Sequence, residues 1–257
     1  MSDPETIGIV GAGGDLGSRM LVQACGTFER VFITDVKDSE DWVVSEIGVD
    51  PSLSTIDDSE PTVSEVNLSE LIENSKTVHW CAAARRALDI EELPSDTMLV
   101  LHNSVMRGSL EVRKRLLKRP SITGKIAVAH CLVNPMKRVE IASDTPHADE
   151  AFDHFESLGL SPHIMRAREH DRAMAETQGL AAFIISYMNK DIKNVDALIR
   201  NGDITPSGGR FFEGLNSQDA IWTDETKNTI LANPELAKLV WSLPLYWLKN
   251  KIKSPKS

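Results

Sequence analysis

The sequence contains no uninterrupted run of about 18 apolar residues, the length that a membrane-spanning helix requires. Its first residues, MSDPETIGIVGAGG, are polar and acidic before they turn apolar, unlike the basic and then apolar start of a secretory signal. The chain has 257 residues, 41% of them apolar, which is enough to bury a sizeable core. We therefore expect a folded cytoplasmic protein that makes no membrane contact.

The sequence also lacks cysteine and histidine spacings typical of metal sites, and it has few basic residues. The three cysteines, Cys25, Cys81 and Cys131, form no Cys-x-x-Cys pair and no Cys/His spacing typical of zinc, so we expect free thiols and no metal. Only 28 Lys and Arg oppose 38 Asp and Glu, which gives a formal net charge of −10. A chain this acidic repels a phosphate backbone, which argues against nucleic-acid binding.

The acids are concentrated in one segment. Between Asp35 and Ser75, twelve Asp and Glu are accompanied by a single Lys37. Charge runs of this kind are usually solvated, and few apolar residues interrupt this one. We expect a variable crossover on the surface.

Short β-branched runs alternate with helical patterns over the first 165 residues. A repeated order of strand, crossover and strand predicts an α/β fold, with a doubly wound parallel sheet and helices on both faces. From His170 onward the strand signal stops and apolar residues recur at helical spacing. The predicted strands are 6–11, 30–35, 77–82, 97–104, 125–130 and 163–167, and the later helical segments lie around 194–201, 218–232 and 234–250.

A glycine-rich turn follows the first predicted strand, in the segment IGIVGAGGDLGSRM. Glycines allow a pyrophosphate to approach backbone N–H groups at a helix N-terminus, where a side chain would block the contact. The spacing is Gly-x-x-Gly-x-x-Gly, with Ala12 in the place of one expected glycine. The predicted cofactor-binding residues of this turn are Gly11, Ala12, Gly13, Gly14, Asp15, Leu16 and Gly17.

The second predicted strand ends in Asp35, about 18 residues after Gly17. A carboxylate at this place accepts hydrogen bonds from a ribose 2′-OH and repels a 2′-phosphate, so we expect NAD in preference to NADP. Lys37 weakens this discrimination, and NADP stays possible. The sequence thus predicts a dinucleotide-binding Rossmann-type domain over residues 1–166. An all-helical domain over residues 167–257 would complete its core by dimerisation.

Chemically active side chains end three later strands, at Cys81, Ser104 and His130. Ligands of open parallel sheets bind at the carboxyl ends of strands, so Cys81 is a candidate for cofactor contact. If their strands are adjacent, Ser104 and His130 converge beside the nicotinamide. There a histidine can exchange a hydrogen bond with a hydroxyl that is being oxidised. His102 is a second candidate for this role.

Several of these segments together resemble the prephenate and arogenate dehydrogenases of tyrosine biosynthesis. VGAGGDLGSRM is similar to the family's glycine-rich opening, LHNSVMRGSL to its Ser-Val-Lys segment, and AVAHCLVNPM to its Gly-x-His-Pro segment. REHDRAMAETQGLAAF resembles the start of its helical dimerisation domain, and NSQDAIWTD its tryptophan segment. The resemblance implies a homodimer in which His130 is the catalytic histidine and Ser104 contacts both nicotinamide and substrate. It also places Trp222 on the family tryptophan.

The segment Glu169-His170-Asp171 marks the domain junction in this family. We favour a capping and junction role for these residues over catalysis, because acids in a first helical turn complement the helix dipole. Arg168, beside the segment, is a cation that could reach an anionic ligand. Gln178 follows on the same helix as a further substrate-binding candidate.

The sequence departs from the family around the expected substrate pocket. Cys131 replaces the proline after the histidine, and the NPM segment offers an alignment that would put Asn134 in the histidine's place. Ala181 and Ala182 stand where the family carries Arg-His or Pro-His. The family's Asp-x-x-Arg reads Arg210-x-x-Glu213 here, and loss of an arginine from a carboxylate site is hard to replace. Arg210 itself could bind the substrate carboxylate.

The predicted activity is oxidative decarboxylation of prephenate or arogenate with hydride transfer to NAD. His130, assisted by Ser104, would hydrogen-bond the ring hydroxyl as it becomes a carbonyl. Two alternatives stay open: a related dehydrogenase that acts on a different small cyclic or hydroxy acid, and a nucleotide-binding regulatory protein without activity.

Overall fold

The computed structural model describes residues 6–35, 61–133, 136–180, 183 and 224–242. Contacts divide the chain into two compact units, Met1–His170 and Asp171–Ser257. The sequence prediction placed the division after residue 166. Arg210, Glu213, Trp222, Asn134, Ala181, Ala182, Lys37 and the predicted helix at 194–201 lie outside the described residues.

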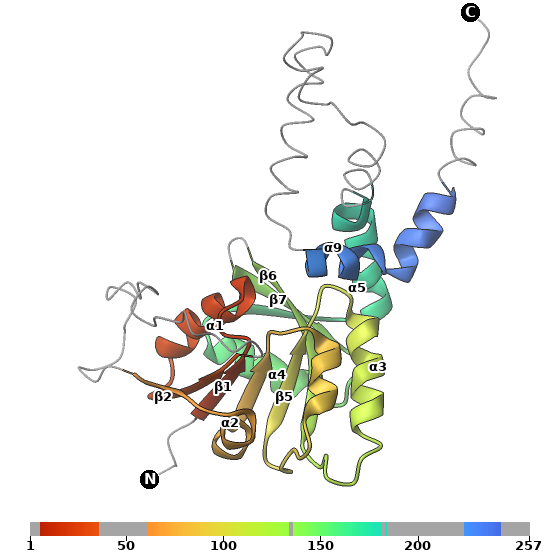
Figure 1. The fold of residues 1–257 in the computed structure, drawn as a ribbon. Helices are drawn as coiled ribbons and strands as arrows, with labels where there is room; N and C mark the ends of the chain where they lie inside the picture. Colours follow the sequence, from red (N-terminus) through yellow and green to blue (C-terminus); the bar gives the residue numbers. More distant parts are fainter. Residues whose placement is uncertain (1–5, 36–60, 134–135, 181–182, 184–223, 243–257) are drawn as a thin grey trace, which may run out of the picture. The chain divides into compact units, whose positions relative to one another are not determined.

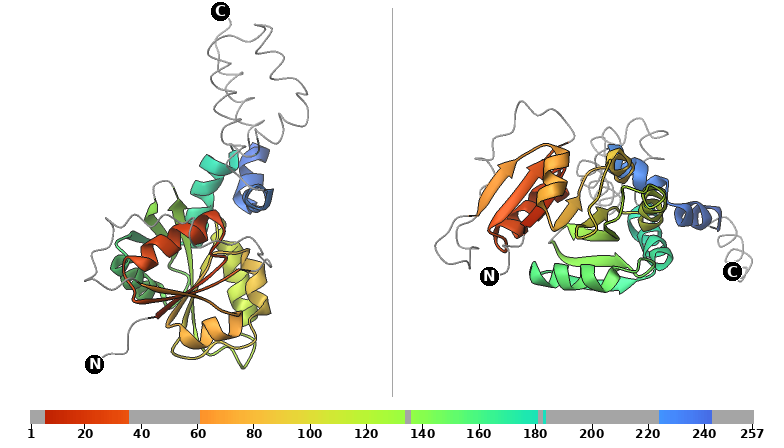
Figure 2. Two further views of the ribbon diagram at one scale, coloured as in Figure 1. Left: turned by 60° about the vertical axis from the view of Figure 1, so that its left-hand side comes forward. Right: turned by 90° about the horizontal axis from the view of Figure 1, so that it is seen from below.

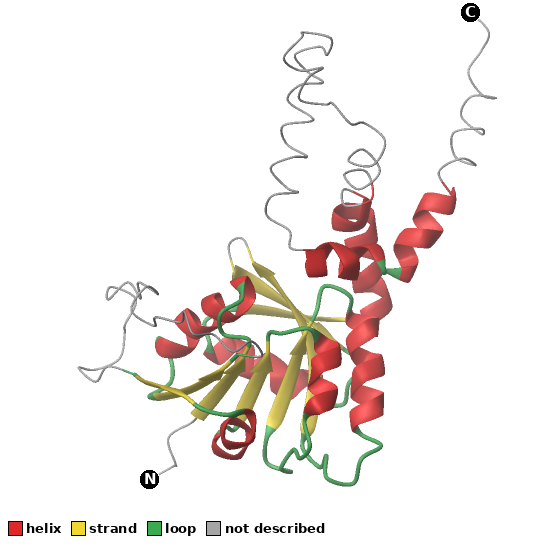
Figure 3. Cartoon of the chain, in the orientation of Figure 1, coloured by secondary structure: helices red, strands yellow, loops and turns green. Residues whose placement is uncertain are grey.

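The first unit is built on an eight-stranded sheet (Figures 1 and 3). Apolar and β-branched residues fill its central strands, such as TIGIV and MLVLH, because these strands are buried on both faces. In spatial order the strands are β3 (Thr62–Glu65), β2 (Arg30–Thr34), β1 (Thr6–Val10), β4 (Thr77–Trp80), β5 (Met98–His102), β6 (Lys125–Val133), β7 (Met136–Ala142) and β8 (Ser161–Met165).

All neighbouring strands are parallel except β6 and β7, which are antiparallel. The predicted α/β fold of Rossmann type is confirmed, but the sheet is mixed and not wholly parallel. Strand β7 was missed because charged Lys137, Arg138 and Glu140 interrupt its apolar residues. Val139 and Ile141 alternate with Arg138 and Glu140 and are fully buried, and Ala142, on the opposite face of the strand, is also buried.

Helices cover both faces of the sheet (Figure 2). On one face, α1 (Asp15–Cys25) and α4 (Ala148–Ser157) bury Met20, Leu21 and Phe155 at helical spacing. On the other face, α2 (Leu68–Asn74), η3 (Ala84–Asp89) and α3 (Met106–Leu116) bury Leu71 and Leu116, among other residues. The doubly wound arrangement expected from the sequence is therefore present.

The described part of the acidic segment contains β3 and α2. Residues 36–60 lie outside the described residues, so the variable surface crossover stays a prediction. β3 has an exposed, half-buried, half-buried and exposed pattern at the sheet edge, which gives little apolar signal. Asn67 caps α2 by accepting a hydrogen bond from the Glu70 N–H (3.0 Å).

All elements that the structure describes in the second unit are helical. Helix α5 (Ala167–Met174) continues into a π-helical turn, η4 (Ala175–Gly179), and α9 (Asp224–Leu231) is followed by helical residues 234–242. Asn233 donates a hydrogen bond from Nδ2 to the backbone oxygen of Asp171 (2.7 Å). Among the described residues, no helix is long and apolar enough to cross a membrane.

Candidate functional site

The glycine-rich turn joins β1 to α1 at the carboxyl edge of the sheet. Gly11 has φ of +80°, a conformation that side chains disfavour, and its N–H donates to the Thr34 oxygen on β2 (2.8 Å). The Gly14 N–H donates to the Gly11 oxygen (3.1 Å) and closes the turn just before α1 begins at Asp15. Because α1 begins directly after this turn, the backbone N–H groups of its first turn lie at a helix N-terminus, where an anion is stabilised.

Gly17 allows α1 to pack directly against this turn. A Cβ atom at Gly17 would lie 2.0 Å from the Gly11 oxygen and 2.8 Å from the Ala12 Cα. Both neighbours are backbone atoms of the turn, so neither can move away cheaply. The third glycine of the spacing is therefore required by close helix–strand packing.

We expect the substitution Gly17→Ala to destabilise the protein by about 1–3 kcal/mol and to abolish dinucleotide binding, because the turn must open to admit the methyl group. Gly108→Ala in α3 is the matched control, since its Cβ would meet only Asn103 Nδ2 at 4.0 Å. This control is expected to stabilise the protein by about 0.5–1 kcal/mol. Urea denaturation and calorimetric titration with NAD measure both effects. Equal stabilities of the two variants would contradict the packing argument.

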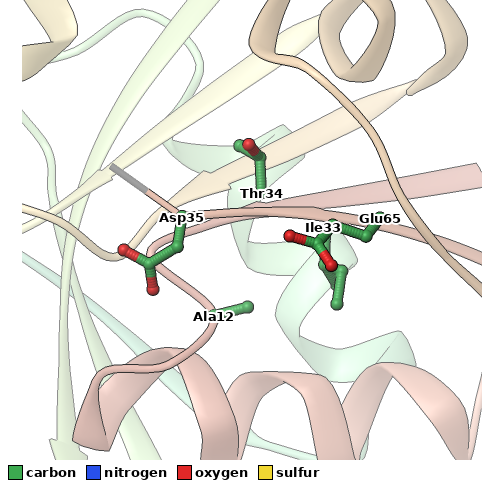
Figure 4. A pocket seen from close by; sticks show the side chains of 5 residues that line it. All are labelled: Ala12, Ile33, Thr34, Asp35 and Glu65. Atoms are coloured by element: carbon green, nitrogen blue, oxygen red, sulfur yellow. The ribbon is translucent and has the colours of Figure 1, made fainter. Parts of the chain in front are cut away.

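Two carboxylates border a pocket between β2, β3 and the glycine-rich turn (Figure 4). Asp35 follows β2, and its Oδ2 accepts a hydrogen bond from the Gly13 N–H (3.1 Å). Glu65 ends β3, which pairs in parallel with β2, and Ala12 forms part of the same lining. Glu65 was not among the predicted site residues because β3 was not recognised. A second carboxylate here adds to the repulsion of a 2′-phosphate.

The other predicted cofactor residues lie along the same edge of the sheet. Asp15 is exposed in the first turn of α1, with its Oδ1 3.1 Å from Arg19 Nε. Leu16 is partly buried against the core. Cys81 follows β4 and donates its N–H to the Val10 oxygen (2.9 Å). Burial, and then Cys131, raise the pKa of the Cys81 thiol well above its usual value, so it stays protonated.

His130 lies on β6, beside β5, as its predicted pairing with Ser104 requires. Ser104 is half-buried in the turn that leads from β5 to α3. The His130 side chain is 7% exposed, and its Nδ1 lies 3.0 Å from His170 Nε2. His170 Nε2 is in turn 3.7 Å from Oε2 of Glu140, which pairs with His130 across β6 and β7.

His102, the alternative candidate, belongs to a different buried cluster. Its partner in the sheet is Ala129, so its side chain points to the face of the sheet opposite to His130. His102 Nε2 lies 2.8 Å from His79 Nδ1, and His79 Nε2 lies 2.8 Å from His154 Nε2. His102 Nδ1 is 3.5 Å from the Cys131 sulfur. Burial first, and then His154, lower the pKa of His102 to about 3, so its ring is neutral.

Solved structures resemble this chain, whereas the sequence comparisons found no match. No protein-family model and no curated protein matches the chain. Prephenate dehydrogenase from A. aeolicus, solved in complex with hydroxyphenyl propionate and NAD+, is 15% identical, with 97% of this chain and 91% of that chain covered and a TM-score of 0.63. Synechocystis arogenate dehydrogenase is also 15% identical, with coverage of 95% and 90% and a TM-score of 0.63.

The chain has the fold of the prephenate and arogenate dehydrogenases. The resemblance predicted from the sequence is thus confirmed in fold. A UDP-glucose dehydrogenase from the archaeon Pyrobaculum islandicum matches with a lower TM-score of 0.51 at 16% identity, over 74% of this chain and 52% of that chain. The fold is therefore shared with dehydrogenases that have other substrates, and it does not identify the substrate.

The structure describes two of the four predicted substrate-binding residues. Arg168 is exposed on α5, and Gln178 is half-buried in η4. Arg210 and Trp222 are outside the described residues, so their roles stay predictions.

The capping and junction role expected for Glu169, His170 and Asp171 holds only in part: Glu169 lies in the first turn of α5 and the two units divide between His170 and Asp171, but Asp171 is not in the first turn. Helix α5 begins at Ala167, whose N–H donates to Asp144 Oδ2 (2.7 Å), so Asp144 satisfies the first turn. Asp171 comes a full turn later and is fully buried, as is His170. Apolar spacing alone could not predict the start of the helix, because Asp144 is 23 residues away.

Proposed function

We propose that the protein is an NAD-dependent dehydrogenase. The observation that carries this proposal is the glycine-rich turn with Gly13 hydrogen-bonded to Asp35, at the carboxyl edge of a sheet with the dehydrogenase fold. A Cβ at Gly11 or Gly17 would collide with the backbone of Ala82 or of the turn itself, so both glycines are needed for the tight turn and the close helix packing that a dinucleotide-binding motif requires.

In this proposal the chain's own groups bind and orient the cofactor. The backbone N–H groups of the first turn of α1 face the pyrophosphate, and Asp35 accepts hydrogen bonds from the adenosine ribose, with Glu65 beside it. Bound NAD supplies a hydride acceptor. Ser104 and Cys81 lie after the neighbouring strands β5 and β4, where they would border the nicotinamide.

The proposed substrate is prephenate or arogenate, and the reaction is an oxidative decarboxylation. The ring hydroxyl of the substrate would hydrogen-bond to His130, assisted by Ser104, while this hydroxyl becomes a carbonyl. Arg210 and Arg168 would bind the carboxylates of the substrate. Gln178 and Trp222 would also contact the substrate. Aromatisation of the ring supplies the driving force, so the protein has mainly to align the reacting atoms. We further propose that two copies associate through their helical units.

The choice of cofactor gives a direct prediction. Asp35→Ala should weaken NAD binding by about 10- to 100-fold, because a hydrogen bond to a charged group contributes about 1.5–3 kcal/mol. NADP binding should weaken less or improve, and the double variant with Glu65→Ala should move the preference further toward NADP. Calorimetric titration with each dinucleotide measures both affinities. Glu73→Ala, which removes an exposed acid from α2, is the control. An unchanged NAD/NADP ratio in the double variant would contradict the placement of the ribose.

Turnover of prephenate and of arogenate, each with NAD and with NADP, tests the activity. The proposal predicts formation of reduced nicotinamide and an aromatic product from at least one of the two acids. NAD binding without turnover of either acid would reject this substrate assignment.

A different small cyclic or hydroxy acid is the second candidate for the substrate. The observation that favours it is in the sequence, where Arg210-x-x-Glu213 replaces the family's Asp-x-x-Arg and Ala182 replaces its histidine. A panel of such acids, assayed in the same way, distinguishes it from a regulatory protein without activity.

A further inference from the structure

The strongest feature that the proposed reaction leaves unexplained is the group of side chains behind His130. His130, His170 and Glu140 come from β6, α5 and β7, and their side chains are 7%, 0% and 6–7% exposed. We propose that His170 and Glu140 are positioning residues that hold the His130 ring in one orientation for the substrate hydroxyl. This inference rests on the proposed function in one respect, the role of His130 in the reaction.

The contact between the two histidines fixes the His130 ring. His130 Nδ1 and His170 Nε2 are 3.0 Å apart, and the ring planes are nearly perpendicular at 88°. A buried ring nitrogen that lacks a hydrogen-bond partner is destabilised, because it has lost its contact with water. Rotation of the His130 ring by half a turn would break the bond, so a single ring orientation is favoured. With Nδ1 engaged by His170, the substrate hydroxyl meets Nε2.

Glu140 acts on this pair through its charge. Its Oε2 is 3.7 Å from His170 Nε2, which is longer than a hydrogen bond, whereas its Oε1 is 3.0 Å from Arg138 Nη2. The ion pair holds the carboxylate in place, and Arg138 is 55% exposed, so solvent screens its charge more than that of Glu140. A buried carboxylate at this distance stabilises positive charge on the histidine pair.

The arrangement suits a histidine that receives a hydrogen bond from an alcohol. A bond between two ring nitrogens needs a proton on one and a lone pair on the other. In the tautomer in which His130 Nδ1 donates to His170 Nε2, the lone pair of His130 is on Nε2, and the inference requires this tautomer for accepting the hydrogen bond of the hydroxyl. The positive charge that builds up on His130 as the hydroxyl loses its proton then spreads toward His170 and Glu140. The proton returns to the product oxygen, because the aromatic product is a phenol.

Two substitutions at His170 separate positioning from simple packing. His170→Leu removes the partner of Nδ1, and we expect kcat to fall by about 10- to 100-fold with NAD affinity unchanged, as for other partners that orient functional histidines. His170→Gln places an amide near the position of Nε2 and should restore most of kcat. Equal losses of kcat in both variants, matched by equal drops in thermal midpoint, would assign His170 a structural role and overturn the inference.

A second readout does not depend on turnover. Nitrogen-15 NMR of the histidine rings in the full chain reports which nitrogen of His130 carries its proton. The inference predicts one fixed tautomer, protonated at Nδ1, in the wild type and in His170→Gln, and exchange between tautomers in His170→Leu. A fixed tautomer in a wild type that turns over neither acid keeps this positioning and rejects the proposed function. A His130 ring that already exchanges in the wild type would reject the positioning itself, whatever the activity.

Discussion

Substitution of His130 by alanine should lower kcat by about 10²–10⁴-fold, the range contributed by a positioned acid–base group. The affinity for NAD should stay within about twofold, because the groups expected to bind the pyrophosphate and the adenosine ribose lie on the turn after β1, at the start of α1, and at the ends of β2 and β3. Steady-state kinetics with the active acid gives kcat, and calorimetric titration with NAD shows that the variant is folded. This is the largest effect on activity that we expect from a single substitution.

The control for this experiment is His163→Ala. His163 is exposed on β8, in register with Glu140 but outside the bond between His130 and His170. Its replacement should leave kcat unchanged. If His130→Ala kept the turnover of the wild type, the catalytic role of His130 would be wrong. Asn134, which the competing alignment puts in the place of the histidine, would become the next residue to replace.

The largest effect on stability should come from acid. His79, His102 and His154 form a buried chain in which each neutral ring needs one donor and one acceptor. A second proton on His79, which lies between the other two rings, would set two donors against each other at one of its contacts. Burial is the main cause that lowers all three pKa values from 6.5: to about 3 for His102, to about 4 for His154, and well below the usual value for His79.

The sign follows from the protons that each state binds. Between pH 6.5 and about 4, the unfolded chain protonates these three histidines while the folded chain does not, so the free energy of unfolding falls as the pH falls. Each fully shifted histidine costs about 1.4 kcal/mol per pH unit, or on the order of 4 kcal/mol per unit for the three. That is a large part of the 5–15 kcal/mol typical of a domain. Urea denaturation between pH 7 and 5 should show this steep loss.

A variant at the end of the histidine chain provides the comparison. His154→Gln can still reach His79 but cannot take up a proton, so the pH dependence should weaken by about one proton. A free energy of unfolding that stays constant from pH 7 to 5 would contradict the account. An unchanged slope in His154→Gln would show that His154 is not one of the groups responsible.

The sequence predicts the fold best where burial on both faces produces continuous apolar strands. The segments TIGIV, RVFIT, TVHW and MLVLH are strands at the predicted places, within one or two residues at their ends. β3 and β7 were missed because an edge strand and a half-charged strand have weak apolar patterns. Because β7 was not recognised, the antiparallel pairing of β6 with β7 could not be predicted.

The candidate site follows the same division. Asp35 and the glycine-rich turn are close in sequence to the strand ends that position them, so pattern and spacing suffice. His170 contacts His130 across 40 residues, and Glu140 depends on the register of β7. No local pattern encodes such contacts, and the charged run Glu169-His170-Asp171 resembled a helix start. Glu65 was missed with its strand.

A crystal structure of the protein with NAD+ bound tests the central claim most directly. The account predicts the pyrophosphate against the N–H groups of the first turn of α1 and the adenosine ribose hydrogen-bonded to Asp35. It also predicts the nicotinamide at the carboxyl ends of β4, β5 and β6, within reach of His130. A dinucleotide bound elsewhere, or a nicotinamide that leaves His130 out of reach of any substrate on its ring, would contradict the account.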